Sequence, residues 1–447
     1  MVLEPDMTKN AQIERGSRAG AGAKENIYRR ELEGRMGRFL QRKEMIGIRG
    51  ARQTGKTTLM RMIADSLPPE EKRVFVNMDI AEYRRALEEN PKDFVKRQME
   101  EGKKLFLFLD EIQKVKNGGE RLKIIYDEFP DVKAFISGSS SLELKTNVLP
   151  SLVGRLLLFE LYTFGFGEFL SARDGGLHKL FMEKNASLTG LLEGRDEPAP
   201  PSFAGEFLDY WKDYAIFGGY PEVVKSRSSE EKIIILKNIF NLYLEKDIMA
   251  FFKVEDTSKF EDLLKVLAFG ITGILSVSSM ASDLKMSYKK TEDFISMLQH
   301  TYIIHLLKPF YRNLTTEVKK SPKIYFLDLG LRNSAINNFS AFDNRSDRGS
   351  LMENFVLREL VSGFGGSGGW RINYWRTAGK AEMDFVLTRD EKMIPVEVKL
   401  GGDKLGKSFH SFLNAYRPEK AIVATLDTFK KQKIKKTTVY WVPVYYF

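Results

Sequence analysis

The feature that most limits what this chain can fold into is the segment 50–57, which has the pattern G-x-x-x-x-G-K-T. A short apolar run, Met45-Ile-Gly-Ile-Arg, precedes it, and a helical pattern follows it. Glycines at both ends let backbone N–H groups wrap around a phosphate, and the positive end of the helix faces the same point. The segment therefore predicts a P-loop between a strand and a helix. The alternative is a glycine turn with an incidental lysine.

In a P-loop, two of these residues have defined tasks. Lys56 reaches the β- and γ-phosphates, and Thr57 offers its hydroxyl to Mg²⁺. ATP and Mg²⁺ are therefore the expected cofactors. The predicted nucleotide-binding residues are Gly50, Ala51, Arg52, Gln53, Thr54, Gly55, Lys56, Thr57 and Thr58.

A second apolar run ends in two carboxylates. Leu105-Phe-Leu-Phe-Leu precedes Asp110 and Glu111, as expected of a buried parallel strand that carries acids to the carboxyl edge of a sheet. We predict that Asp110 helps to hold Mg²⁺ and that Glu111 polarises the water that attacks the γ-phosphate. The alternative is that the two acids only cap the next helix.

Two further residues are candidates for the same site. A strand-like run over 132–137 leads into small hydroxyl residues, among which Ser139 is the candidate sensor of the γ-phosphate. Arg155 stands at the start of another apolar run, where its guanidinium would stabilise the transferring phosphate in its own subunit or across a subunit interface. A surface arginine at the entry of a strand fits the same pattern.

Length and composition indicate several domains and a polyanionic partner. The chain has 447 residues, so about three domains of ~150 residues are expected. It has no cysteine and four histidines without ligand spacing, which excludes disulfides and a conventional zinc site. A net charge of +10 favours DNA or another polyanion as a partner.

The apolar segments point to a soluble protein. No apolar run approaches the ~20 residues that a bilayer-spanning helix needs, so no membrane partner is expected. Residues 1–24 are polar and Gly/Ala-rich, without the hydrophobic centre of a signal peptide. They predict a flexible tail, and the location is expected to be cytoplasmic.

Several motifs together are similar to those of a known family. They are Gly50-Ala-Arg-Gln-Thr-Gly-Lys-Thr-Thr-Leu, Leu109-Asp-Glu-Ile-Gln, Ser137-Gly-Ser-Ser, Gly154-Arg155 and Phe217-Gly-Gly-Tyr-Pro-Glu. In this order, from about Lys24 onward, the chain resembles the archaeal and bacterial family of predicted AAA+-superfamily ATPases that typically carry a restriction-endonuclease-like C-terminal domain. The resemblance implies an AAA+-like core with an additional strand between the two nucleotide motifs, consistent with the run 74–77. It also strengthens Arg155 as a candidate arginine finger.

The first half of the chain is predicted to hold the ATPase core, at 25–170, and a helical lid, at 171–255. The lid carries a Pro-rich insertion near 193–202 that cannot form a helix interior. A second break, at Gly218-Gly-Tyr-Pro, interrupts its helical pattern.

Residues 256–345 indicate a winged helix-turn-helix, in which helical patterns are followed by β-like runs at 302–307 and 323–327. The helices are expected to present the start of the recognition helix to DNA, and the hairpin to touch backbone phosphate. The candidate DNA-binding residues are Lys285, Tyr288, Lys289, Lys290, Lys319 and Lys320. A protein-docking module with a solvated basic face is the alternative. Residues 340–349 are read as a linker.

The last domain, at 346–447, carries a D…ExK arrangement. Asp384 and Glu397 fall on adjacent strand-like runs, and period-two alternation puts Lys399 on the same face as Glu397. Glu353 can approach from a preceding amphipathic helix over 350–360. We predict that Asp384 and Glu397 hold Mg²⁺ or Mn²⁺ against a phosphodiester while Lys399 orients water or stabilises charge.

The resemblance gives this last domain a PD-(D/E)xK nuclease-like fold with all four active-site positions filled. A degenerate or purely DNA-holding domain remains the alternative. The basic segment 430–436 either follows a phosphate backbone or is an exposed turn before a final strand.

Together these patterns predict an α/β multidomain protein: a P-loop AAA+-like ATPase with a helical lid, a winged helix-turn-helix and a C-terminal PD-(D/E)xK nuclease-like α/β domain. The main hypothesis is an ATP-hydrolysing, DNA-binding and DNA-processing enzyme with branched DNA as one candidate substrate. One alternative is an ATP-driven regulatory switch that binds DNA or protein without cleaving, and another is a chaperone-like remodeller of proteins. An arginine finger that acts in trans would require a homo-oligomer.

Overall fold

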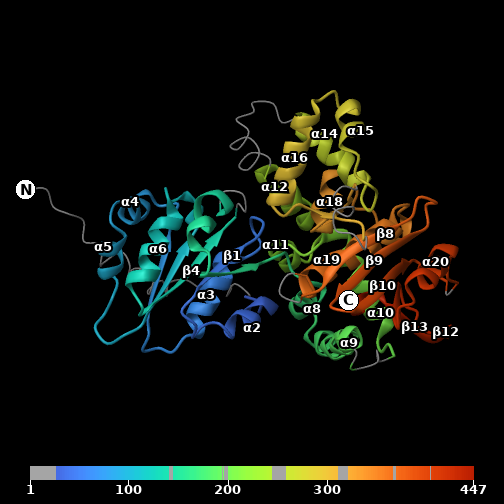
Figure 1. The fold of residues 1–447 in the computed structure, drawn as a ribbon, viewed down its shortest axis with the longest axis horizontal. Helices are drawn as coiled ribbons and strands as arrows, with labels where there is room; N and C mark the ends of the chain where they lie inside the picture. The colour runs from blue at the N-terminus through green and yellow to red at the C-terminus, as the bar shows by residue number, and fades with distance from the viewer. Residues whose placement is uncertain are drawn as a thin grey trace, which may run out of the picture. The chain divides into compact units, whose positions relative to one another are not determined.

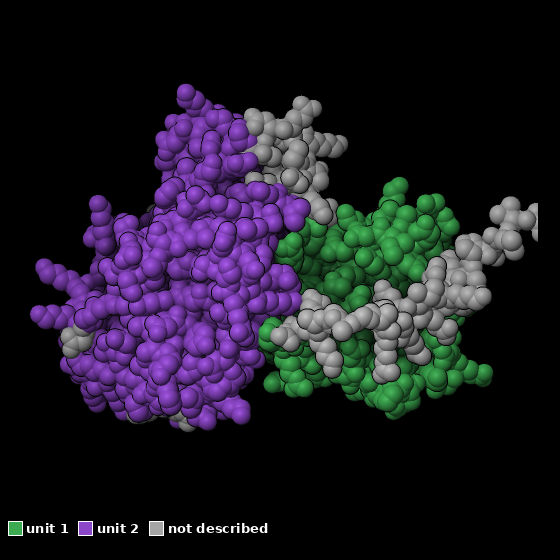
Figure 2. Space-filling model, turned by 180° about the vertical axis from the view of Figure 1, so that it is seen from behind, with its two compact units in different colours: residues 1–161 green, residues 162–447 purple. Residues whose placement is uncertain are grey.

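The computed structural model describes residues 27–139, 144–193, 195, 200–243, 258–310, 321–365, 369–402 and 404–447. The predicted tail at 1–24, part of the Pro-rich insertion, and Lys319 and Lys320 lie outside these ranges. The chain forms two compact units, residues 1–161 and 162–447, shown in green and purple in Figure 2. None of the helices in the described ranges has the length and apolar character that crossing a membrane requires.

The first unit is built on a five-stranded parallel sheet in the order β2-β3-β4-β1-β5 (Figure 1). Its strands are β1 (Met45–Arg49), β2 (Lys72–Asn77), β3 (Leu105–Asp110), β4 (Val132–Gly138) and β5 (Leu156–Glu160). Its helices are α2 (Glu31–Gly37), α3 (Lys56–Ser66), α4 (Ala81–Glu89), α5 (Pro91–Lys96) and α6 (Gly118–Glu128).

Both faces of the central strand β3 are buried, which explains its unbroken apolar run. Leu105, Leu107 and Leu109 belong to one hydrophobic cluster, which includes side chains from α4, α5 and α6. Phe106 and Phe108 point to the opposite face and belong to a second cluster with α2 and α3. Helices therefore cover both sides of the sheet, as in other parallel sheets.

The strand between the two nucleotide motifs occupies a different place in the sheet than in the sequence. Strand β2 follows the P-loop along the chain, but it forms the edge of the sheet beside β3. The strand that separates β1 from β3 in space is β4, which pairs with both. The carboxyl ends of β1, β4 and β3 consequently lie side by side.

The second unit begins with helices and ends with a mixed sheet (Figure 1). The helices of its first part are α8 (Phe166–Arg173), α9 (Gly175–Glu193), α10 (Ala204–Phe217), α11 (Pro221–Lys225) and α12 (Ser229–Tyr243). There follow α14 (Ser258–Phe269), α15 (Val277–Asp283), α16 (Tyr288–His300), β6 (Ile304–Leu307), β7 (Lys323–Phe326) and α18 (Leu329–Ala335). Strands β6 and β7 form an antiparallel pair.

The C-terminal part of this unit holds a six-stranded sheet in the order β12-β13-β11-β10-β9-β8. Its elements are α19 (Arg348–Gly363), β8 (Arg371–Arg376), β9 (Glu382–Arg389), β10 (Lys392–Lys399), α20 (Lys407–Tyr416), β11 (Lys420–Thr425), β12 (Lys430–Ile434) and β13 (Thr437–Pro443). The basic segment 430–436, for which an exposed turn was one expectation, is mostly the edge strand β12, which pairs with β13.

The break between α10 and α11 is a close approach of backbone to a buried acid. Gly218 has φ +71°, and a Cβ there would lie 2.2 Å from a carboxylate oxygen of Asp328. A Cβ on Gly219 would meet the carbonyl oxygen of Phe164 at 2.2 Å. The N–H of Gly219 donates to Asp328 at 2.9 Å. The two glycines are therefore required for packing within this unit.

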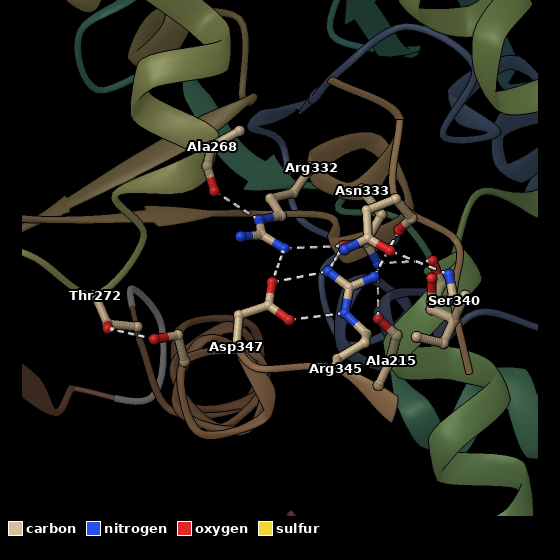
Figure 3. A network of polar contacts seen from close by, with 11 residues as sticks. Ala215, Ala268, Thr272, Arg332, Asn333, Ser340, Arg345 and Asp347 are labelled. Atoms are coloured by element: carbon tan, nitrogen blue, oxygen red, sulfur yellow. Dashed lines mark hydrogen bonds and ion pairs between the residues drawn. The ribbon is translucent and has the colours of Figure 1, made fainter. Parts of the chain in front are cut away.

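The segment read as a linker is held in place by a buried ionic network (Figure 3). Arg345 donates to both oxygens of Asp347, at 2.8 Å each. Arg332 from α18 donates to the same carboxylate at 2.5 Å and to the carbonyl oxygen of Ala268 at 2.7 Å. Both arginine side chains are buried. The segment that connects the two parts of this unit is therefore fixed by buried polar contacts.

Replacing Asp347 by Asn is expected to lower the free energy of unfolding at pH 7 by about 3 kcal/mol, because two buried guanidinium groups lose their shared carboxylate. Burial opposes ionisation of Asp347, but hydrogen bonds from Arg345 and Arg332 outweigh it and lower its pKa to about 2. This stabilisation is therefore present above the unfolded pKa of ~4 and is lost as the pH falls from ~4 towards 2.

Urea denaturation of both proteins as a function of pH measures this difference. The control is Asp343→Asn, which removes an exposed ion pair with Lys212 and should cost less than about 1 kcal/mol. Equal effects of the two substitutions would contradict a structural role for the network.

Candidate functional site

The loop between β1 and α3 depends on glycine at both ends. A Cβ on Gly50 would lie 2.0 Å from the carbonyl oxygen of Leu161. Gly55 has φ +91° at the amino end of α3. From outside the loop, the guanidinium of Arg30 donates to the carbonyl oxygen of Thr54 at 2.7 Å. The loop is thus fixed in shape, with the amino terminus of α3 directed at its concave side.

Lys56 lies inside this loop. Its ammonium donates to the carbonyl oxygens of Gly50 at 3.0 Å and Ala51 at 2.8 Å, and the residue is 6% exposed. Among the other predicted loop residues, Arg52 is half-buried, whereas Gln53 and Thr58 are exposed. The ammonium of Lys56 therefore lies on the inside of the loop, where the negative charge of a bound phosphate would be.

The structure brings Thr57 and Asp110 together. The hydroxyl of Thr57 donates to one oxygen of Asp110 at 2.6 Å. The other oxygen of Asp110 accepts a hydrogen bond from Ser137 at the end of β4. Ser137 was not among the candidate residues, although it stands in the Ser137-Gly-Ser-Ser motif. A hydroxyl and a carboxylate side by side are the donor types that Mg²⁺ prefers.

Glu111 is held in a defined position beside Asp110. It adopts a left-handed conformation, with φ +56°, which is uncommon for a residue other than glycine. Its carboxylate accepts a hydrogen bond from Ser139 at 3.1 Å and another from the side-chain amide of Gln113. Gln113, which sequence reasoning missed as a site residue, also donates to Ser139 at 3.4 Å. Ser139 and Glu111 therefore belong to one polar cluster.

Arg155 lies at the other end of the sheet. Its carbonyl oxygen accepts from the N–H of Met45, at the start of β1, whereas the loop follows the end of β1. Its guanidinium donates to Asp127 at 2.9 Å and lies 5.8 Å from the ring centre of Tyr126. This placement separates Arg155 from the loop of its own chain.

Comparisons with known proteins agree with the geometry of the first unit. Residues 42–170 match the family model described as an AAA domain. Residues 208–341 and 348–447 match two families described only as domains of unknown function, DUF8612 and DUF4143.

Several curated relatives share most of the chain. An uncharacterised protein of Mycobacterium tuberculosis is 24% identical over 380 residues, which are 83% of this chain and 74% of the relative. An uncharacterised protein of Haemophilus influenzae is 23% identical over 364 residues, which are 78% of this chain and 81% of the relative. The similarity thus extends well beyond residues 42–170.

Among solved structures, a Walker-type ATPase of Pyrococcus abyssi is 14% identical with a TM-score of 0.44, and the match covers 69% of this chain and 96% of that one. The Aeropyrum pernix ORC1 protein in complex with DNA is 14% identical with a TM-score of 0.28, over 70% of this chain and 94% of that one.

A second polar site lies in the C-terminal part of the second unit. Asp384 on β9 accepts a hydrogen bond from the N–H of Val398 at 2.8 Å. Burial raises the pKa of Asp384, and the charges of Glu353 and Glu397 raise it further. Burial and the charge of Glu353 also raise the pKa of Glu397, to about 7, although Lys399 opposes this. The three predicted acids therefore lie close enough to repel one another.

Two residues that sequence reasoning missed complete this cluster. Lys323 on β7 forms ion pairs with Glu353 at 3.2 Å and with Glu382, and Tyr325 donates to Glu353 at 2.6 Å. The period-two spacing of Lys323 and Tyr325 puts both on one face of β7. No motif in the sequence near this strand indicates that it lies beside Glu353. Lys399 donates to the carbonyl oxygen of Lys404 at 3.0 Å.

The residues present fit one divalent cation. In the ranges that the structure describes, no three His, Cys, Asp or Glu side chains are arranged to hold a metal ion. Asp384 and Glu397 remain as a pair, and Oε2 of Glu397 is buried without a hydrogen-bond partner. Mg²⁺ is commonly held by one or two carboxylates, with water completing its shell. Two acids that repel each other and an unsatisfied oxygen are consistent with such an ion.

The candidate DNA-binding residues that the structure describes lie in the turn between α15 and α16 and at the start of α16. Lys285 is in this turn with φ +52°, and Tyr288 at the start of α16 is 55% exposed. Lys289 forms ion pairs with Asp293 at 2.9 Å and Glu292 at 3.6 Å. Lys290 is exposed and lies 5.5 Å from the ring centre of Phe294. The described lysines are thus exposed and close together in the sequence, but the charge of Lys289 is partly neutralised.

Proposed function

We propose that this chain is a DNA-processing enzyme that hydrolyses MgATP in its AAA domain and carries a metal-dependent nuclease site in its second unit. The observation that carries the ATPase proposal is the direct hydrogen bond between Thr57 and Asp110 beside the loop that contains Lys56. These groups come from two motifs that are distant in sequence and have no other evident reason to be adjacent.

The chemistry of the AAA domain follows from the positions of these side chains. Backbone N–H groups of the loop and the ammonium of Lys56 would bind the phosphates, and Thr57 and Asp110 would hold Mg²⁺. Bound Mg²⁺ would neutralise charge on the phosphate oxygens. Glu111, oriented by Ser139 and Gln113, would accept a proton from the attacking water.

Two substitutions separate binding from turnover. Lys56→Ala is expected to weaken nucleotide binding at least about tenfold, because the ammonium that meets the phosphates is lost. Glu111→Gln is expected to bind nucleotide normally and to lose turnover by about 10²-fold or more, because only the base is removed. A fluorescent nucleotide titration and a phosphate-release assay measure the two effects. Turnover by Glu111→Gln at the rate of the unmodified protein would contradict the assignment.

Arg155 is proposed to act on the nucleotide of a neighbouring subunit in a homo-oligomer. The support for this is its placement at the opposite end of the sheet from the loop of its own chain, together with its partly exposed side chain beside Asp127. On approach of a partner, the guanidinium would exchange part of its contact with Asp127 for phosphate oxygens.

Mixing two inactive variants tests this role. Arg155→Ala retains Glu111, and Glu111→Gln retains Arg155, so a mixed oligomer contains interfaces with both groups intact. We expect the mixture to recover phosphate release that neither variant shows alone. If Arg155 acted within its own chain, or had only a structural role, the mixture would stay inactive.

For DNA binding, the support is the order of elements between α14 and β7. A helix, a turn and a second helix are followed by an antiparallel strand pair, which is the order of a winged helix-turn-helix. Lys285 is exposed in the turn before α16, and Tyr288 and Lys290 are exposed at its start, which is the end of a recognition helix that usually meets base edges. This segment is the proposed DNA-binding face.

A matched set of lysine variants tests this face. The double substitution Lys285→Ala with Lys290→Ala is expected to weaken binding and to reduce the slope of log K against log salt by about one to two, because two phosphate contacts are lost. Lys289→Ala should change both much less, since Asp293 and Glu292 already neutralise that ammonium. Fluorescence anisotropy with duplex and branched DNA at several salt concentrations measures this, and equal effects of all three lysines would argue against the face.

The nuclease proposal rests on the acids of β9 and β10. Asp384→Asn is expected to abolish cleavage that depends on Mg²⁺ or Mn²⁺, whereas Lys56→Ala should retain it because the two sites use different residues. A panel of duplex, single-stranded and branched DNA assayed for cutting and for ATP turnover measures both. No cleavage of any substrate, with DNA-stimulated turnover intact, would favour an ATP-driven switch that binds DNA without cutting it.

A further inference from the structure

The carboxylate site contains a lysine from outside the C-terminal domain. Lys323 belongs to β7, within the segment 208–341 that matches one family, whereas the acids lie in the segment 348–447 that matches another. Its side chain is 3% exposed, and its ammonium pairs with Glu353 at 3.2 Å and with Glu382. The site is therefore assembled from two segments of the second unit.

A buried ammonium in this position is held by several neighbours. The ring centre of Tyr374 lies 5.6 Å from the ammonium, and Tyr374 is itself fixed by a 2.7 Å hydrogen bond to the carbonyl oxygen of Ser321. Burying an unpaired charge costs free energy, and the two carboxylates and the aromatic ring offset this cost for Lys323. Lys323 is thus a permanent part of the site.

Lys323 and Tyr325 both form hydrogen bonds with Glu353. Both donate to the same oxygen, Oε1 of Glu353. On the far side of Lys323, Glu382 also pairs with Arg376 at 3.3 Å. Glu353 and Glu382 are therefore already neutralised by protein cations, whereas Asp384 and Glu397 repel each other and Oε2 of Glu397 has no hydrogen-bond partner. Of these four acids, Asp384 and Glu397 are the two for which the described residues provide no ion pair.

We propose that Lys323 is a built-in cation that restricts this site to one divalent metal ion, held by Asp384 and Glu397, while Tyr325 keeps Glu353 beside the lysine. This inference rests on the proposed metal-dependent function of the same site. In such a site, the ammonium supplies the positive charge that a second metal ion would otherwise bring to Glu353 and Glu382. Lys323 and Tyr325 are then positioning residues, and Glu353 is not a metal ligand.

The number of Mn²⁺ ions bound by the full-length, nucleotide-free protein tests the proposal. Electron paramagnetic resonance of free Mn²⁺ gives the stoichiometry, and the Mn²⁺-induced rise in melting temperature gives an independent measure. The unmodified protein should bind one ion, and Asp384→Asn should bind none. Lys323→Met should bind two ions and show a larger Mn²⁺-induced rise, because Glu353 and Glu382 become available as ligands. Lys308→Met, which alters an exposed lysine next to β6, should behave like the unmodified protein.

A milder substitution covers the case in which Lys323→Met does not fold. Glu353→Gln keeps the shape of the side chain and an oxygen that accepts from Tyr325, and it should still bind one Mn²⁺. Loss of the ion in Glu353→Gln would overturn the proposal, because it would make Glu353 a ligand.

The outcomes also separate this inference from the function on which it rests. No Mn²⁺ binding by the unmodified protein, or equal binding by Asp384→Asn, would refute the metal-dependent site itself. Two ions in the unmodified protein, or one ion with unchanged affinity in Lys323→Met, would refute only the role of Lys323.

Discussion

The hydrogen bond between Thr57 and Asp110 depends on the register of the central sheet. Ile48 on β1 pairs with Ser137 on β4, and Leu109 on β3 pairs with Ile136. The strands that carry the loop, Ser137 and Asp110 therefore end at the same level. A slip of one residue would turn every side chain of a strand to the opposite face. Thr57, Asp110 and Ser137 therefore come together only with this strand register.

The two faces of the sheet fix that register. On one face, the rings of Phe108 and Phe135 stack at 4.6 Å between centres, and Phe75 stacks on Phe108 at 5.9 Å. On the other face, the leucines of β3 pack under α4, α5 and α6. A slip of β3 would move its phenylalanines into the space for leucines, and the tightly packed core tolerates such volume changes poorly. Hydrophobic packing thus aligns the polar groups at the edge.

The local part of this organisation could be predicted from the sequence. The loop, the run of β3 and the acids after it are contiguous, and each carries its own periodicity or spacing. Ser137 and Gln113 were missed because their role depends on which strands are neighbours, and β4 lies between β1 and β3 only in space. The position of Arg155 followed from the sequence in principle, since a residue at the start of a parallel strand lies opposite the carboxyl edge.

The packing of the second unit was harder to predict from the sequence because buried charged side chains stabilise it. Arg358 on α19 forms an ion pair with Glu359 at 2.6 Å, and Glu359 accepts from the N–H of Phe166 on α8 at 3.2 Å. The hydrogen bond between Phe166 and Glu359 joins segments that are 193 residues apart in the chain. Charged residues in a sequence suggest a solvated surface, so neither this contact nor the network around Asp347 is visible before the fold is known. The edge strand β12 was missed for the same reason, since its lysines resemble a solvated turn although charge on an edge strand also prevents unwanted pairing.

Three buried lysines show how the partners of one residue type decide its role. Lys133 on β4 donates to the carbonyl oxygens of Phe39 at 2.9 Å and Arg42 at 2.8 Å, and burial lowers its pKa to about 8. It fastens the segment after α2 to the sheet. Lys56 also donates to two neutral carbonyl oxygens, but it lies at the carboxyl edge, at the amino terminus of a helix.

Hydrogen bonds to neutral carbonyl oxygens orient the ammonium of Lys56 without adding a formal negative charge of their own, as the proposed phosphate-binding role requires. Lys323 has carboxylate partners, which cancel its charge towards an approaching anion and make it a counter-ion for the acids around it. The ammonium of Lys56 is therefore suited to bind a substrate, and that of Lys323 is suited to set how many metal ions its neighbours accept. In both proposed roles, the oxygen atoms that surround the ammonium matter as much as the lysine itself.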